Sequence, residues 1–357
     1  MSYFKILTII SLAYFLNSCD GTKKDEKKIF SIDTAALKQV YQPNESTNFV
    51  VLNIENKNID SVLYSINDKK IGSVKGNNKL FFTLKNEKLG YQKIKAIVYF
   101  ENKTTETETN FTIVAQNAPK LLTYKIKNTY PHDIKAYTQG FEFYRDTLIE
   151  GTGNGTGSGT GKKGTSSLRK TNYKTGEVYK TVELASTYFG EGITVLNNKV
   201  YQLTYKNNEG YVYNADTFKK EKTLPYFKNM EGWGLTNDGK NLYMSNGTEK
   251  IYILDPETLK EIDYINVFTN ANKIESVNEL EFIDGKIWAN IYGKDAIAII
   301  NPTNGAVENI INLKDLKAKV TQHPDLDVLN GIAYNPKTKT VFITGKNWDK
   351  VFEITVE

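Results

Sequence analysis

The chain has 357 residues, of which 39% are hydrophobic and 12% aromatic, enough for a sizeable core in two or three domains and too many for a disordered protein. The net charge of +5 is spread thinly, with no Lys/Arg block beyond short pairs in the body of the chain, so nucleic-acid binding is not expected. The 23 tyrosines and 25 glycines favour strands and tight turns over helices.

Residues 1–19, MSYFKILTIISLAYFLNSC, contain one Lys and an apolar stretch from Ile6 to Leu16 that is too short for a stable membrane span. We interpret this segment as a signal peptide. The chain's only cysteine, Cys19, resembles the lipidated cysteine of a bacterial lipobox; an ordinary cleaved signal with a chance cysteine is the alternative. The segment therefore predicts an exported, membrane-anchored lipoprotein in the periplasm or at the cell surface, without disulfides.

Residues 20–28, DGTKKDEKK, are expected to form a solvated tether. Residues 29–118 then contain the short alternating segments NFVVLNIE, SVLYSIN, KLFFTLK, YQKIKAIVYF and TETNFTIVA, separated by polar turns. This spacing predicts a small immunoglobulin-like β-sandwich. No cluster of titratable residues suggests chemistry in it, so a role as a spacer or docking module is favoured.

Residues 119–357 contain a repeat of about 40–50 residues, a period that is typical of a β-propeller. Each unit has a polar residue at its head, a short strand, a tight turn and a second strand, and further hairpins follow. Five units predict an all-β, five-bladed β-propeller in which the stretch from Leu121 to Tyr130 supplies the outermost strand of the last blade. The five heads are Gln139, Glu191, Glu231, Asn278 and Asn330.

The first strand of each blade lines the central channel of a propeller, so the heads are expected to gather at one mouth of that channel. The ends of the second strands should reach the same mouth. A convergent polar set ringed by aromatic residues is the default hypothesis for a binding or active site. The second strands would contribute Glu150, Tyr205, Asn246, Tyr292 and Lys346.

Glu191 is the candidate for proton transfer, because Phe189 and Tyr205 give it a half-apolar setting that raises the pKa of a carboxyl group. Lys346 ends an apolar strand, where an ordinary solvated lysine is not expected. Trp233 lies between two glycines and either exposes its ring to the mouth or packs between blades.

Other patterns favour structural explanations. Glu231 and Glu279 are expected to bind backbone N–H groups or a channel cation. The two histidines, His132 and His323, occur in unlike contexts, which disfavours a zinc site or a catalytic triad. The run Gly159–Gly164 matches G-x-G-x-x-G by its letters, but a predicted strand follows it, so we interpret the whole run 151–164, GTGNGTGSGTGKKG, as a flexible loop.

Residues 121–357 resemble the plant and bacterial glutaminyl-peptide cyclotransferases, also called glutamine cyclotransferases. The resemblance implies a five-bladed propeller that converts the N-terminal glutamine of peptides or proteins to pyroglutamate and releases ammonia. It implies an acyltransferase that requires no metal, and it leaves room for a structural cation in the channel. The matching motifs, in family order, are YTQGF, SSLRKT, FGEGITVL, YQLTY, EGWGLTNDGK, VNELEFIDGKIWANIY, DVLNGIAYN and FITGKNW.

Matched residue by residue, the resemblance implies that Glu191 takes a proton from the α-amine and passes it to the departing ammonia. Asn278 and Lys346 match polar residues of the family's pocket that suit holding the amide and the developing oxyanion. Gln139 matches a residue that positions the substrate. The aromatic residues expected to bind substrate are Tyr137, Phe189, Tyr205, Trp233 and Tyr292.

The chain departs from the family at the pocket wall. Tyr205 and Tyr292 stand where the family usually has Trp, and Tyr137 stands where Phe is common. These changes predict altered substrate affinity rather than lost chemistry. A monomer is expected. The alternatives are a non-catalytic propeller lipoprotein that binds peptide or glycan, and a metal-dependent sugar-lactone hydrolase on a similar scaffold.

Overall fold

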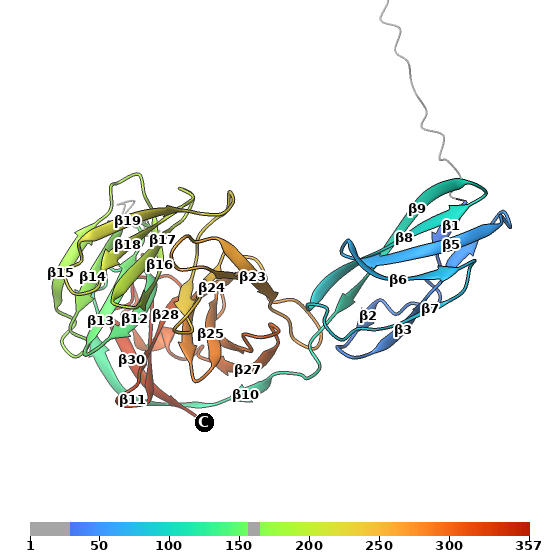
Figure 1. Ribbon diagram of the computed structural model, residues 1–357. Helices are drawn as coiled ribbons and strands as arrows, with labels where there is room; N and C mark the ends of the chain where they lie inside the picture. Colours follow the sequence, from blue (N-terminus) through green and yellow to red (C-terminus); the bar gives the residue numbers. More distant parts are fainter. Residues whose placement is uncertain (1–28, 156–164) are drawn as a thin grey trace, which may run out of the picture.

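The computed structural model describes residues 29–155 and 165–357 (Figure 1). The predicted signal peptide, the lipidation site Cys19, the tether and the run Gly159–Gly164 lie outside these residues. All regular structure in the described ranges is strand, apart from the short 3-10 helix η1 (Lys317–Lys319). No helix in these ranges is long and apolar enough to cross a membrane. For these residues the prediction of an all-β fold is confirmed.

Three sheets occupy residues 30–113, and their orders are β1-β4, β2-β9-β8-β5-β6 and β3-β7. The predicted segment NFVVLNIE is divided between β3 and β4, because β3 pairs with β7 whereas β4 pairs with β1. The sequence analysis missed β6, whose side chains are mostly exposed and lack apolar alternation. The strands are β1 (Phe30–Ile32), β2 (Val40–Tyr41), β3 (Ser46–Phe49), β4 (Val51–Asn53), β5 (Ile59–Ile66), β6 (Lys69–Lys75), β7 (Leu80–Thr83), β8 (Gly90–Phe100) and β9 (Lys103–Ile113).

Five further sheets are formed after residue 119 (Figure 1). The first has β12 (Thr138–Tyr144), β13 (Thr147–Thr152), β14 (Ser167–Thr171) and β15 (Val178–Glu183), and the second β16 (Gly190–Leu196), β17 (Lys199–Thr204), β18 (Glu209–Asn214) and β19 (Lys220–Pro225). The third has β20 (Leu235–Asn237), β21 (Leu242–Ser245), β22 (Lys250–Leu254) and β23 (Glu261–Asn266). The fourth has β24 (Val277–Ile283), β25 (Lys286–Ile291), β26 (Ala296–Ile300), β27 (Val307–Asn312) and β10 (Lys120–Leu122), and the fifth β28 (Leu329–Asn335), β29 (Thr340–Gly345), β30 (Lys350–Val356) and β11 (Tyr124–Pro131).

The inner strands of these five sheets follow one another in a circle. Each of β12, β16, β20 and β24 contacts the next inner strand, and β28 contacts β12. Strand β11 precedes the first sheet in the chain and pairs antiparallel with β30 of the fifth sheet, which closes the circle. The predicted outer strand is therefore confirmed for Tyr124–Tyr130. Leu121 and Leu122 belong instead to β10, which pairs in parallel with β27 of the fourth sheet.

Glycine lets the inner strands approach closely at one end. A Cβ on Gly192 would lie 2.6 Å from the carbonyl oxygen of Trp233, and a Cβ on Gly234 only 1.9 Å from that of Asn278. The backbone N–H of Gly192 donates to Trp233 O over 2.7 Å. Strand pairing is irregular just before Ile193, so the residue before the glycine is turned out of the regular ladder.

This geometry corrects the head of the third unit. Leu235 pairs with Met244 as Ile193 pairs with Gln202 in the second sheet, so Trp233 and not Glu231 occupies the position of Glu191. The segment MEGWG contains two residues that precede a glycine, and the pattern alone could not choose between them.

Glu150 is also corrected, because it lies in a buried network rather than at the mouth. Its carboxylate accepts hydrogen bonds from Arg169 over 2.6 Å, from Thr138 over 2.7 Å and from His132 over 3.0 Å. The His132 Nδ1 atom lies 2.8 Å from the backbone oxygen of Trp348. Burial alone would raise the pKa of Glu150, but Arg169 and His132 outweigh it and lower the pKa to about 2. The network joins the first sheet to the fifth.

Replacing Glu150 with Gln should destabilise the five sheets by about 3 kcal/mol, because Arg169 would keep a buried charge without its closest carboxylate. The stabilisation from a depressed carboxyl pKa is present above about pH 4.5 and is lost as the pH falls toward about 2. The free energy of unfolding at each pH can be measured by denaturant titration monitored by tryptophan fluorescence. The chain's three tryptophans are Trp233, Trp288 and Trp348.

The matched control is Glu257→Gln, which removes an exposed carboxylate paired with Lys199 and Lys222. Solvent screens those pairs, so the unfolding midpoint should hardly move. Equal midpoints for the two variants would contradict the structural role of Glu150.

Candidate active site

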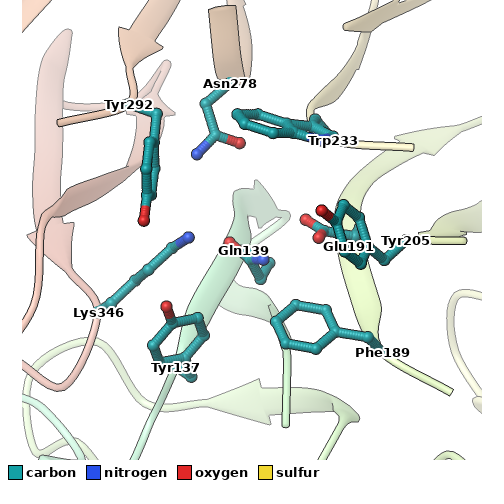
Figure 2. Close-up of a pocket in the computed structure, with 9 residues that line it drawn as sticks. All are labelled: Tyr137, Gln139, Phe189, Glu191, Tyr205, Trp233, Asn278, Tyr292 and Lys346. Atoms are coloured by element: carbon teal, nitrogen blue, oxygen red, sulfur yellow. The ribbon is translucent and has the colours of Figure 1, made fainter. Parts of the chain in front are cut away.

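One cavity of about 240 Å³ opens at the end of the circle where the inner strands begin. Figure 2 shows its nine lining side chains, with Glu191 and Lys346 on opposite sides and Gln139 between them. These nine are the residues that the sequence analysis named as catalytic or substrate-binding, and the structure brings all of them together. They are Tyr137, Gln139, Phe189, Glu191, Tyr205, Trp233, Asn278, Tyr292 and Lys346.

Three other residues predicted at the mouth do not line this cavity. Asn330 is fully buried and donates to the backbone oxygen of Thr138 over 2.9 Å. Asn246 accepts a hydrogen bond from Thr248 in its own turn. Glu231 forms an ion pair with Lys206 at 3.3 Å and accepts a hydrogen bond from the indole N–H of Trp233.

Asn330 nevertheless orients the floor of the cavity. Its amide nitrogen lies 3.4 Å from the side-chain oxygen of Gln139. This contact turns the NH₂ group of Gln139 toward Glu191, to which Gln139 donates a hydrogen bond. The buried asparagine therefore contacts the cavity lining through Gln139.

Aromatic rings form most of the wall. Tyr137 meets Phe189 edge-on with ring centroids 6.0 Å apart, and Trp233 meets Tyr292 in the same way at 5.8 Å. Glycines back these rings closely: a Cβ on Gly153 would lie 2.4 Å from the ring of Phe189. The sequence analysis assigned Gly153 to a flexible loop, so it missed this role in shaping the wall.

Burial dominates the electrostatics of Glu191, whose side chain is nearly inaccessible to solvent. Loss of solvent raises the pKa of Glu191 well above its usual value of 4.5, although Lys346 acts in the opposite direction. The negative charge of Glu231 raises the pKa of Glu191 further. The apolar setting inferred from the sequence thus has the expected effect.

Lys346 is subject to the complementary effect. Burial lowers the pKa of its amine below 10.5, and the carboxylates of Glu191 and Asp327 partly oppose that change. Its Nζ atom lies 4.8 Å from the ring centre of Tyr137 and 5.2 Å from that of Tyr292. Both distances allow a cation–π attraction that holds a charged amine in the cavity.

Asp327 is a residue that the sequence analysis missed. Its carboxylate accepts a hydrogen bond of 2.8 Å from the hydroxyl of Tyr137, and its backbone oxygen accepts one of 3.1 Å from the indole of Trp348. The hydroxyl that distinguishes Tyr137 from the phenylalanine common in the family therefore has a specific partner. No local pattern around Asp327 indicated this contact, which joins residues far apart in the chain.

Glu279 binds backbone N–H groups, which is one of the two roles expected of it. Its two carboxylate oxygens accept hydrogen bonds from the backbone N–H groups of Phe141, over 3.3 Å, and Ile332, over 3.0 Å. These two residues lie on two other inner strands. In the ranges 29–155 and 165–357, no group of three or more His, Cys, Asp or Glu side chains is arranged to bind a metal.

The fold and the cavity together define a class: an all-β protein in which a circle of sheets carries a small, aromatic-walled pocket with a buried acid facing a buried amine. Comparison with known proteins specifies the family. A sequence model described as glutamine cyclotransferase matches residues 95–356, beginning within β8. The chain therefore belongs to the glutamine cyclotransferase family.

Two relatives illustrate the relationship. The glutaminyl-peptide cyclotransferase of Arabidopsis thaliana is 38% identical over 231 residues, which are 64% of this chain and 69% of the relative. The crystal structure of Myxococcus xanthus glutaminyl cyclase is 28% identical and has a TM-score of 0.60, covering 67% of this chain and 98% of that one.

Proposed function

We propose that this protein converts the N-terminal glutamine of peptides or proteins to pyroglutamate and releases ammonia. Membership of the glutamine cyclotransferase family supports the reaction. The observation that carries the proposal is the placement of Glu191 and Lys346, both almost fully buried, on opposite sides of a cavity of about 240 Å³. That volume suits one amino-acid residue rather than a folded partner.

The proposed reaction begins with the α-amine of the substrate beside Glu191. The ionised carboxylate removes one proton as the amine nitrogen attacks the γ-carboxamide carbon. The carbonyl oxygen then becomes negatively charged, and the protonated amine of Lys346 and the amide of Asn278 stabilise it. Glu191 returns its proton to the departing nitrogen, the carbon–nitrogen bond breaks, and ammonia leaves with the lactam formed.

The aromatic wall is proposed to supply orientation and to exclude water. Tyr137, Phe189 and Trp233 surround the space between the acid and the amine, so a glutamine side chain there must fold back toward its own α-amine (Figure 2). Holding both reacting groups in contact can contribute about 7 kcal/mol or more toward lowering the barrier. Gln139 is proposed to hold the carboxyl of Glu191 in place through its hydrogen bond.

We infer a finer description of the fold as well. The five sheets are proposed to be the blades of a five-bladed β-propeller spanning 119–357, supported by the circular contacts of the inner strands and the pairing of β11 with β30. Residues 29–118 are proposed to be an immunoglobulin-like sandwich, supported by their three antiparallel-rich sheets around one hydrophobic cluster.

Glu191→Gln should lower kcat for a glutaminyl dipeptide by about 10²–10⁴-fold, because the amide cannot relay a proton. Ammonia release in a coupled assay measures the rate. Glu257→Gln is the matched control and should keep the wild-type rate, since Glu257 is exposed and outside the cavity. The chemistry needs no metal, so chelation should also leave the rate unchanged.

Two results would redirect this proposal. Absence of ammonia release by the wild-type protein, with retained peptide binding, would favour the non-catalytic alternative. A rate that collapses on chelation would favour a metal-dependent hydrolase.

The pH profile of kcat/KM should be bell-shaped. Glu191 accepts a proton only when ionised, so the acid limb should lie above 4.5, because burial raises the pKa of this carboxyl. Lys346 stabilises the oxyanion best when protonated, so the basic limb should lie below 10.5, because burial lowers its pKa. A rate that is still maximal at pH 4 would contradict the assignment of Glu191 as the base.

We also propose that the protein is exported and anchored to a membrane through a lipid on Cys19. The support comes from the apolar stretch and the single cysteine of the first nineteen residues. The wild-type protein expressed in a bacterium should incorporate labelled palmitate and sediment with membranes. Cys19→Ser should abolish both; a labelled Cys19→Ser protein would contradict the anchor.

A further inference from the structure

A second cavity of about 440 Å³ lies directly beside the first, and Tyr292 lines both. The two cavities therefore meet at Tyr292, and 43% of this residue is exposed. The second cavity, here called the side pocket, opens between the segment that precedes β24 and the face of the fourth sheet that packs toward the third sheet. Its apolar lining includes Ile274, Ile291, Ile297, Ala298 and Ile310.

The lining of the side pocket is an incompletely covered part of a hydrophobic core. Ala298 and Val307 are buried members of the cluster between the third and fourth sheets. Ile274, Ile291 and Ile310 pack against that cluster but are only partly buried. An occupant with an apolar side chain would complete their burial and gain the hydrophobic free energy that these surfaces now leave unused.

We propose that the side pocket binds the side chain of the residue that follows the N-terminal glutamine, so that the enzyme favours substrates with a large apolar second residue. This inference rests on the proposed function. The reacting glutamine fills the first cavity, and its α-carbonyl must lead out past the wall. Because Tyr292 lines both cavities, a chain that leaves the first cavity past this residue would bring the next side chain to the side pocket.

The opposite rim of the first cavity offers a less suitable exit. There Lys206 lies over the ring of Tyr205 at 4.6 Å and forms an ion pair with Glu231 at 3.3 Å. An apolar side chain on that side would cover charged groups without replacing their interactions. The side pocket also has charged residues in its lining, but Lys273 and Glu275 form an ion pair with each other. The isoleucines of the lining therefore remain available to an apolar side chain.

The test compares two amidated dipeptides, Gln-Gly-NH₂ and Gln-Phe-NH₂, by the ratio of their kcat/KM values. For the wild-type protein the ratio of Phe to Gly should be about tenfold or more, the range that hydrophobic subsites provide. Ile274→Asp places a charge in the side pocket and should bring the ratio close to one. Ile274→Thr, a milder change, should lower it partly and guards against misfolding of the first variant.

The matched control is Ile262→Asp on β23, where the isoleucine is 57% exposed and does not line the side pocket. This variant should keep the wild-type ratio. Equal kcat/KM values for both dipeptides in the wild-type protein, or an unchanged ratio in both Ile274 variants, would overturn the subsite while leaving the cyclisation intact. A wild-type protein that releases ammonia from neither dipeptide would instead overturn the proposed function.

Discussion

The close approach of the inner strands is the constraint on which the pocket depends. At Gly192 and Gly234 the neighbouring backbone lies where a side chain would stand, so these strands converge at the mouth as they could not with larger residues. Convergence brings side chains from five different sheets around a space of about 240 Å³. The residue before each of these glycines, Glu191 and Trp233, is thereby directed into that space.

The same convergence sets the chemistry by removing water. Glu191 and Lys346 would both be charged in solution, but here both are buried. Burial raises the pKa of Glu191 and lowers the pKa of Lys346, so it favours the neutral form of each group. An acid with a raised pKa can give back the proton that it takes, and an amine held between the rings of Tyr137 and Tyr292 can meet a developing negative charge. Under the proposed mechanism, preorganisation of this kind would supply much of the rate enhancement.

The sequence could predict much of this arrangement because repeated local signals carry it. The polar heads, the alternating strands and the turn residues follow from patterns within about 20 residues. These patterns and the resemblance to the cyclotransferase family together led to the nine residues around the cavity. The failures arose where a pattern was ambiguous or the contact was long-range. Two glycines in MEGWG concealed the true position of Trp233, and Glu150 looked like a mouth residue although its partners His132 and Arg169 keep it buried. Asp327 meets Tyr137 only because the circle closes, and no short segment records that contact.

A crystal structure of the protein with a glutaminyl peptide analogue that cannot cyclise would test the central claim most directly. The account predicts that the α-amine lies at hydrogen-bond distance, about 2.7–3.2 Å, from the carboxyl of Glu191, with the γ-carbonyl oxygen similarly close to Lys346. A bound analogue whose α-amine and γ-amide both lie away from these two side chains would contradict it.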